Sequence, residues 1–207
     1  MTRGMLAALR SGRQRTWVDA ALLHELRATH TPATIFLTGL WTRTYPRVVR
    51  ALARDPLFEL ENHSLDHAAW RAPCYGLPVV TGTSRKRLEV RSTQRVIQRV
   101  AGVRPRFFRF PGGCASAADR RLVAHLGLRP VGWDVVSDDA FDPDPATIVR
   151  GVLTYLRPGS IVVAHCIGPP NAPGTAAAMA RLIPAIRARG YRFVTLDGLL
   201  ARRRRAD

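Results

Sequence analysis

The stretch that decides the fold is Leu57–His67, LFELENHSLDH, in which an apolar run ends just before two histidines. Residues 57–61 predict a short strand that stops before His63. His63 and His67 are four residues apart, so a helical turn at this point would present both imidazoles on one face, where they can bind one metal ion. The preceding strand and Ser64, as a helix cap, favour this interpretation; the alternative is a pair of surface histidines in a loop.

Helical and strand patterns alternate on both sides of this stretch. Helices are expected at residues 17–29, 46–54, 84–100, 116–126 and 145–156, and from the Pro-rich loop 168–174 to Arg189. Strands are expected at residues 33–38, 57–61, 106–110, 130–135, 160–164 and 191–196. Regular alternation of this kind predicts parallel strands joined by crossover helices. No internal repeat and no linker interrupts the pattern, so residues 1–207 are expected to form a single domain.

Polar residues follow the C-terminal ends of four of the expected strands. They are His63 with His67, Arg109, the cluster from Asp134 to Asp139, and His165. In a parallel α/β barrel these strand ends converge on one rim, whereas in an open sheet only those near a switch point would meet. A set drawn from four strands therefore favours an α/β fold closed as an irregular (β/α) barrel.

Each of these positions also has a plainer explanation. The segment Arg109–Gly113 can aim a guanidinium at a carboxylate beside open backbone, but Pro-Gly after a strand is usually a turn. A carboxylate of residues 133–139 could orient a histidine. Alternatively, the segment could be a solvated acidic loop with an N-cap for the next helix, an explanation that accounts for Asp142 and Asp144. His165 is placed to act as a general acid or to be a core histidine.

The charge of the chain first suggests a polyanionic partner. It has 32 basic and 15 acidic residues, a formal net charge of +17, and Lys86 as its single lysine. The arginines are scattered, as a codon bias would leave them, and no nucleic-acid recognition motif accompanies them, so no nucleic acid is expected as partner. No apolar run approaches the ~20 residues of a membrane span, and the N-terminus lacks the pattern of an export signal.

The three cysteines, Cys74, Cys114 and Cys166, form no CxxC motif, so a cysteine zinc site is not expected. Three cysteines are also too few for a disulfide scaffold. A single Cys74–Cys114 bridge stays open for an oxidising compartment.

The ordered set of motifs resembles the polysaccharide deacetylase family, also called the NodB homology domain, of carbohydrate esterase type. The resemblance runs from about Trp17 to Leu200. It is carried by the segments TPATIFLTGLW (31–41), ELENHSLDH (59–67), FRFPGG (108–113), GWDVVSDDAF (132–141), GSIVVAHCIGPPNAPGT (159–175) and RARGYRFVTLDGLL (187–200).

The resemblance implies an irregular (β/α) barrel that removes acetyl groups from N-acetylated polysaccharide, peptidoglycan or chitin-like, with a divalent metal, usually zinc. It also implies roles for eight residues. These are His63 and His67 as metal ligands, Arg109 as the residue that positions the catalytic base, Asp139 as the partner that tunes the acid, His165 as that acid, and Pro111, Gly112 and Gly168 in substrate binding.

The chain departs from the family at its first motif, a strand that ends in aspartates serving as catalytic base and third metal ligand. Residues 1–16 do not match the family and hold no carboxylate, and Asp19 falls in the first turn of a helix. The barrel is therefore expected to lack its first strand, and the activity of the chain as written to be impaired. Either the true start lies upstream, with a cell-envelope or extracellular location, or the chain is a non-catalytic glycan-binding relative.

Overall fold

The computed structural model describes residues 1–206, with side chains through Arg202. The chain forms two compact units. Unit 1 consists of Met1–Gln14 and Thr34–Gly132, and unit 2 of Arg15–Ala33 and the residues from Trp133 onward. The prediction that residues 1–207 form one domain stays a prediction.

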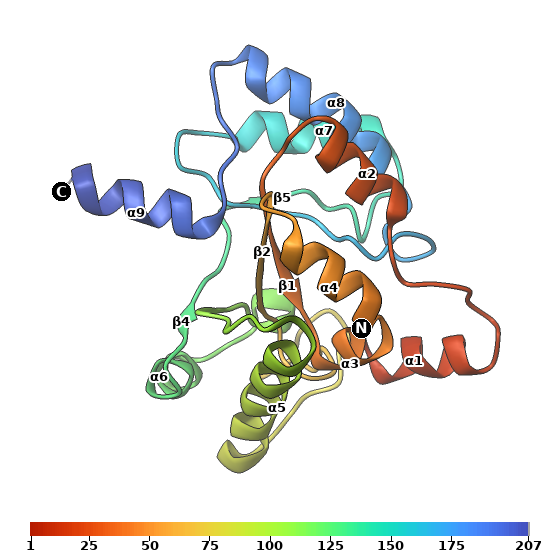
Figure 1. The fold of residues 1–207 in the computed structure, drawn as a ribbon, viewed down its shortest axis with the longest axis vertical. Coiled ribbons are helices and arrows are strands. Elements are labelled where there is room, and N and C mark those ends of the chain that lie inside the picture. The colour runs from red at the N-terminus through yellow and green to blue at the C-terminus, as the bar shows by residue number, and fades with distance from the viewer. Residues whose placement is uncertain (207) are drawn as a thin grey trace. The chain divides into compact units, whose positions relative to one another are not determined.

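Unit 1 is built on a four-stranded sheet in the order β1-β2-β3-β4. The strands are β1 (Ala33–Leu37), β2 (Phe58–Asn62), β3 (Phe107–Phe108) and β4 (Arg129–Pro130). β3 pairs in parallel with both β2 and β4, and Asn62 of β2 lies opposite Phe108 of β3. The helices of this unit are α1 (Arg3–Arg10), α3 (Gly39–Thr44), α4 (Pro46–Arg54), α5 (Thr83–Ala101) and α6 (Ala117–His125). α4 and α5 both pack against β2, which lies beside β1 in Figure 1.

Aromatic rings fill the core of unit 1. Phe108 is fully buried, and its ring centroid lies 4.9 Å from that of Phe110 and 5.5 Å from that of Trp70. Val90 of α5 and Val123 of α6 complete the same cluster. This packing fixes the end of β3, from which the Arg109 segment leaves the sheet.

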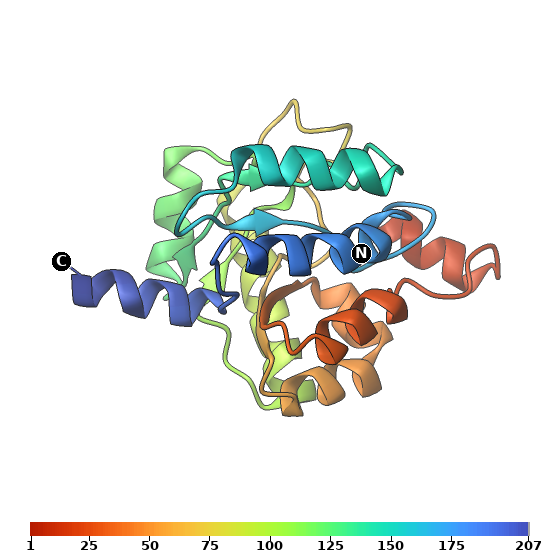
Figure 2. The same cartoon turned by 90° about the horizontal axis from the view of Figure 1, so that it is seen from above.

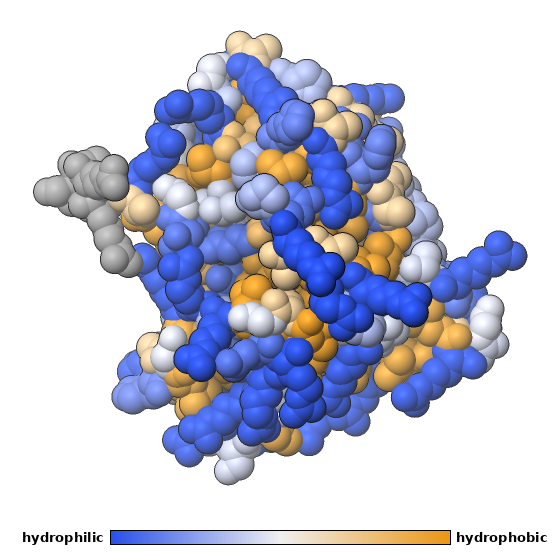
Figure 3. Space-filling view, in the orientation of Figure 1, coloured by the Kyte–Doolittle hydropathy of each residue, from blue (hydrophilic) through white to orange (hydrophobic). Residues whose placement is uncertain are grey.

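The outer face of α5 is strongly basic. Five of its arginines are exposed, namely Arg85, Arg87, Arg91, Arg95 and Arg99. The only carboxylate in the helix, that of Glu89, is buried. Figure 3 accordingly shows hydrophilic residues over this helix, in the lower part of the view.

Unit 2 is a smaller α/β unit. It contains α2 (Ala20–Ala28), α7 (Pro145–Tyr155), α8 (Thr175–Ala188), α9 (Leu196–Ala206) and the parallel pair β5 (Val135–Val136) and β6 (Val162–Val163). α8 packs against both α2 and α7, and Figures 1 and 2 both show α7 and α8 side by side. The core of this unit contains Val135, Ile148, Val152, Ala178, Leu182 and Ile186.

Most expected elements are present with small shifts in their ends. The expected strand at 130–135 is wrong as one element, because Arg129–Pro130 and Val135–Val136 belong to two different sheets. The expected strand at 191–196 is also wrong, since residues 191–195 are irregular. Residues 3–10, for which no element was expected, form α1, and the described residues ahead of β1 contain helices and no strand. No helix within residues 1–206 is long and apolar enough to span a bilayer.

Candidate functional site

The segment from His63 to His67 follows β2 in unit 1. It is irregular and not helical, because the backbone takes left-handed angles at Ser64 (φ 63°) and His67 (φ 62°). The expected helical turn and the role of Ser64 as its cap are therefore wrong. The two imidazoles nevertheless lie close together, with ring centroids 4.8 Å apart.

His63 is held by a backbone contact and has a shifted pKa. Its Nδ1 lies 2.8 Å from the carbonyl oxygen of Arg109. Burial, and secondarily the neighbouring His67, lowers the pKa of His63 well below its usual value. The ring is therefore neutral, so Nδ1 donates its hydrogen to the carbonyl and Nε2 keeps the lone pair that a metal needs.

Contacts distant in sequence hold this segment in place. The Glu89 carboxylate of α5 accepts a hydrogen bond from the backbone nitrogen of Leu65 at 2.9 Å. The Asn62 side chain donates to the carbonyl of Val90 and accepts from the backbone nitrogen of Ser64. These partners were not singled out from the sequence, because they meet the segment only through the packing of α5 on β2.

Gly39, at the start of α3, supports the same segment from another side. Its backbone nitrogen donates to the carbonyl of Ser64 at 3.0 Å. A Cβ at this position would lie 2.7 Å from Leu65 Cδ1 and 2.9 Å from Thr93 Oγ1. A side chain at this position would therefore displace the Leu65 and Thr93 side chains.

Replacing Glu89 by alanine is expected to lower the free energy of unfolding by about 1–3 kcal/mol, because the buried Leu65 N–H loses its acceptor. Glu89 is only 1% exposed, and burial raises its pKa, so water does not replace the lost partner easily. Urea unfolding measures the effect, and Glu25→Ala in α2 is the control, because Glu25 is only partly buried. Equal stability of the two variants would contradict the assigned role.

Arg109 leaves the end of β3 and links several elements of the site. Its guanidinium lies 4.2 Å from the centroid of the Phe36 ring and donates to the carbonyl of Gly132 at 3.1 Å. Burial lowers its pKa to about 10, so the side chain stays charged at neutral pH. Its carbonyl also contacts His63, so Arg109 ties His63 to the end of β3.

A turn of 3-10 helix, Pro111–Gly113, follows Arg109. Gly112 has a φ of +60°, and a Cβ there would clash with the sulfur of Cys74. The structure contains the disulfide Cys74–Cys114, which ties this turn to the loop before α5. The Cys74–Cys114 pairing, which the sequence alone did not decide, is therefore present in the structure.

Asp139 and His165 meet in unit 2. Asp139 is 2% exposed, and its two carboxylate oxygens lie 2.8 Å from His165 Nδ1 and 2.8 Å from the His165 backbone nitrogen. The hydroxyls of Ser137 and Thr175 donate to the same carboxylate at 2.9 and 2.6 Å. Ser137 and Thr175 were not predicted, and only their positions inside two of the family-like segments marked them.

The electrostatics of this pair favour an ionised carboxylate. Burial raises the pKa of Asp139, but the hydrogen bonds and charge of His165 and the hydrogen bond from Thr175 outweigh burial and leave the pKa below its usual value. An ionised Asp139 accepts the Nδ1 hydrogen of His165 and so leaves Nε2 as the nitrogen that can exchange a proton.

Asp19 and Gly168 lie together in unit 2. Asp19 is the N-cap of α2, and its Oδ1 accepts a hydrogen bond from the backbone nitrogen of Leu22 at 2.9 Å. The sequence likewise predicts that Asp19 lies at the start of this helix. Gly168 has a φ of +64°, and a Cβ there would lie 3.5 Å from Asp19 Cβ. One oxygen of the Asp19 carboxylate therefore caps α2.

The donor set for a metal is incomplete in the part of the chain that the structure describes. His63 and His67 suit two positions of a zinc or similar site, because both imidazoles lie together and His63 is neutral. No group of three histidine, cysteine, aspartate or glutamate side chains is arranged to hold an ion among residues 1–206.

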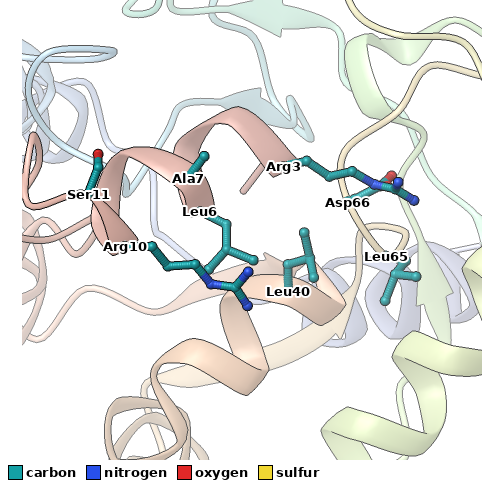
Figure 4. Close-up of a pocket in the computed structure, with 8 residues that line it drawn as sticks. All are labelled: Arg3, Leu6, Ala7, Arg10, Ser11, Leu40, Leu65 and Asp66. Carbon is teal, nitrogen blue, oxygen red and sulfur yellow. The ribbon is translucent and has the colours of Figure 1, made fainter.

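A cavity of about 610 Å³ lies beside the histidine segment in unit 1. It is lined by α1 together with Leu40, Leu65 and Asp66, and Figure 4 shows Arg3 of α1 pointing toward Asp66. The Arg3 Nε lies 2.7 Å from Asp66 Oδ2. None of the eight residues expected in the site lines this cavity.

The family comparison covers the part of the chain that holds the histidine pair and the Arg109 segment. Residues 13–131 match a family model described as polysaccharide deacetylase. A chitooligosaccharide deacetylase of Azorhizobium caulinodans is 29% identical over 187 residues, which covers 84% of each chain. A peptidoglycan-N-acetylglucosamine deacetylase of Bacillus cereus is 26% identical over 178 residues, 86% of this chain and 62% of that protein.

Solved structures show the same fold. A deacetylase with substrate is similar with a TM-score of 0.76 and 30% identity, over 87% of this chain and 83% of that one. A CE4 family pseudoenzyme from Bacillus anthracis is similar with a TM-score of 0.77 and 23% identity, over 89% of this chain and 62% of that one. The prediction of an irregular (β/α) barrel of the deacetylase type is thereby confirmed.

Proposed function

This chain belongs to the polysaccharide deacetylase family. We propose that its reaction is the metal-dependent hydrolysis of N-acetyl groups on a polysaccharide, which is either peptidoglycan or a chitin-like polymer. The observation that carries the proposal is the His63–His67 pair, which lies within the matched residues and has its rings 4.8 Å apart. The relatives are named for the same two kinds of substrate.

In this proposal His63 and His67 hold a divalent cation, most simply zinc. When bound, the cation supplies a Lewis acid for the acetyl carbonyl. The neutral state of His63 and its hydrogen bond to the Arg109 carbonyl support the assignment, since metal-bound histidines commonly have such a second partner.

His165 is proposed as the general acid that protonates the departing amine. The 2.8 Å contact between its Nδ1 and Asp139 supports this role, because the carboxylate stabilises the imidazolium and leaves the Nε2 proton for transfer. Arg109 would position the catalytic base. Pro111, Gly112 and Gly168 would line the site for the acetylated sugar.

We further propose that the 207-residue chain works slowly. The residues ahead of Asp19 contain no carboxylate, and Asp19 itself caps α2. Two imidazoles alone hold zinc weakly, and loss of a general base commonly costs about 10²–10⁴-fold in rate. A non-catalytic glycan-binding relative is the second candidate, and the incomplete donor set among the described residues favours it.

Acetate release from fully N-acetylated chitotetraose, with zinc and with a chelator, tests the proposed function. The chitooligosaccharide deacetylase of Azorhizobium caulinodans serves as a reference assayed in parallel. We expect release at least about 10²-fold slower than the reference. We also expect the release to stop with chelator and in His165→Ala, but not in the exposed control His125→Ala.

The possible outcomes separate the two candidates. Release that persists in the chelator would contradict metal dependence, and release as fast as the reference would contradict the impairment. Binding of chitotetraose without any acetate release would establish the glycan-binding alternative in place of the enzyme.

A further inference from the structure

Tyr75 presents its ring to solvent on the loop between His67 and α5. Its exposed fraction is 69%, although tyrosine normally buries much of its apolar ring. We propose that Tyr75 is a stacking platform for a sugar ring of the polysaccharide. This proposal rests on the proposed function and extends the binding site to the sugar units that flank the acetylated sugar.

The backbone that carries Tyr75 is anchored from both sides. The preceding residue, Cys74, is 5% exposed and is joined by a disulfide to Cys114, 40 residues later. On the other side, the nitrogen of Leu77 donates to the carbonyl of Cys74 at 2.8 Å and closes a turn around Tyr75. The anchored turn therefore loses little backbone conformational entropy when the ring binds a ligand.

The disulfide places Tyr75 next to the turn that follows Arg109. Cys114 directly follows Pro111–Gly113, and a Cβ on Gly112 would lie 3.2 Å from Tyr75 Cδ2. The ring edge is therefore packed on the backbone of Gly112, in space that a side chain there would occupy. If Gly112 binds substrate as proposed above, a sugar at this turn can reach the aromatic face.

The chemistry of the ring suits a sugar chain. A pyranose offers a row of C–H groups on one face and hydroxyls at its edge, whereas tyrosine offers an apolar face and a hydroxyl at its tip. Tyr155 has the same exposed fraction, 69%, but lies in α7 of unit 2 without a disulfide beside it. It is therefore a matched control for a generally exposed tyrosine.

Chitotetraose binding by the full 207-residue chain, measured by isothermal titration calorimetry, tests the role of Tyr75. We expect Tyr75→Ala to weaken binding about 3- to 10-fold, the effect of one aromatic contact, and Tyr75→Phe to retain most of the affinity. Tyr155→Ala should bind as the wild type does. Thermal unfolding of each variant verifies that it is folded.

Wild-type affinity in Tyr75→Ala, or an equal loss in Tyr155→Ala, would overturn the role of Tyr75 and leave the proposed function intact. Failure of the wild-type chain to bind chitotetraose would instead contradict both this role and a chitin-like substrate. Weaker binding by Tyr75→Ala, with wild-type affinity in Tyr155→Ala, supports the platform.

Discussion

Asparagine in place of Asp139 is expected to lower the free energy of unfolding by about 2–4 kcal/mol at neutral pH. The buried carboxylate accepts hydrogen bonds from Ser137, from Thr175 and from both the backbone nitrogen and Nδ1 of His165, and one amide oxygen cannot accept them all. The expected loss of unfolding free energy is smaller than for breaking a fully buried ion pair, because the His165 side chain is 37% exposed. Urea unfolding at pH 7 measures it.

The same substitution at Asp138 is the control. Asp138 is exposed and has a φ of +59°, a conformation that asparagine also tolerates, so Asp138→Asn should change the unfolding free energy by less than about 0.5 kcal/mol. Equal destabilisation by both variants would contradict the special role of Asp139.

The contribution of Asp139 should also depend on pH. Its pKa in the folded protein lies below the usual value, with burial opposing the shift and the contacts of His165 and Thr175 outweighing it. A carboxyl whose folded pKa is lowered stabilises the protein above its unfolded pKa of about 3.9, and this stabilisation disappears as the pH falls through the folded pKa. The stability difference between wild type and Asp139→Asn should therefore shrink as the pH falls below about 4.

Replacing Phe108 by alanine is expected to cost about 3–5 kcal/mol of stability. The ring is fully buried and packs edge-on and tilted against Phe110 and Trp70, so its removal leaves a cavity that backbone groups of β3 cannot fill. Because Arg109 directly follows β3, the loss should also loosen the His63 contact. Denaturant unfolding measures the loss of stability, and NMR signals of the His63 ring report the contact with Arg109.

Phe141→Ala removes the same side chain from an exposed position. Phe141 is 67% exposed, so this variant should lose less than about 0.5 kcal/mol. If Phe141→Ala were as unstable as Phe108→Ala, the assignment of the Phe108 cluster as the core of unit 1 would be wrong.

Local signals in the sequence predicted many helices and strands well. Pro46 opens α4 at the expected residue, because proline suits the first turn of a helix, and Asp144 caps α7 just before Pro145. Strand pairing was predicted less well, because it depends on partners. Residues 130–135 have an apolar pattern, yet the chain leaves one sheet after Pro130 and enters another at Val135.

The residue types of the candidate site were readable, but their geometry was not. Spacing alone suggested a helical turn for His63 and His67, whereas Asn62 and Glu89 fix an irregular segment through hydrogen bonds. Glu89 lies in a helix 22 residues after His67, and no local pattern links the two. Thr175, which completes the shell of Asp139, was hidden for the same reason.

Zinc binding by the 207-residue chain, followed by isothermal titration calorimetry, decides whether His63 and His67 form the metal-binding half of a deacetylase site. We expect one weakly bound ion per chain, lost in the double variant His63→Ala/His67→Ala and kept in His24→Ala/His125→Ala, which removes two exposed histidines. Equal zinc binding by the two double variants would contradict the assignment of His63 and His67 as metal ligands.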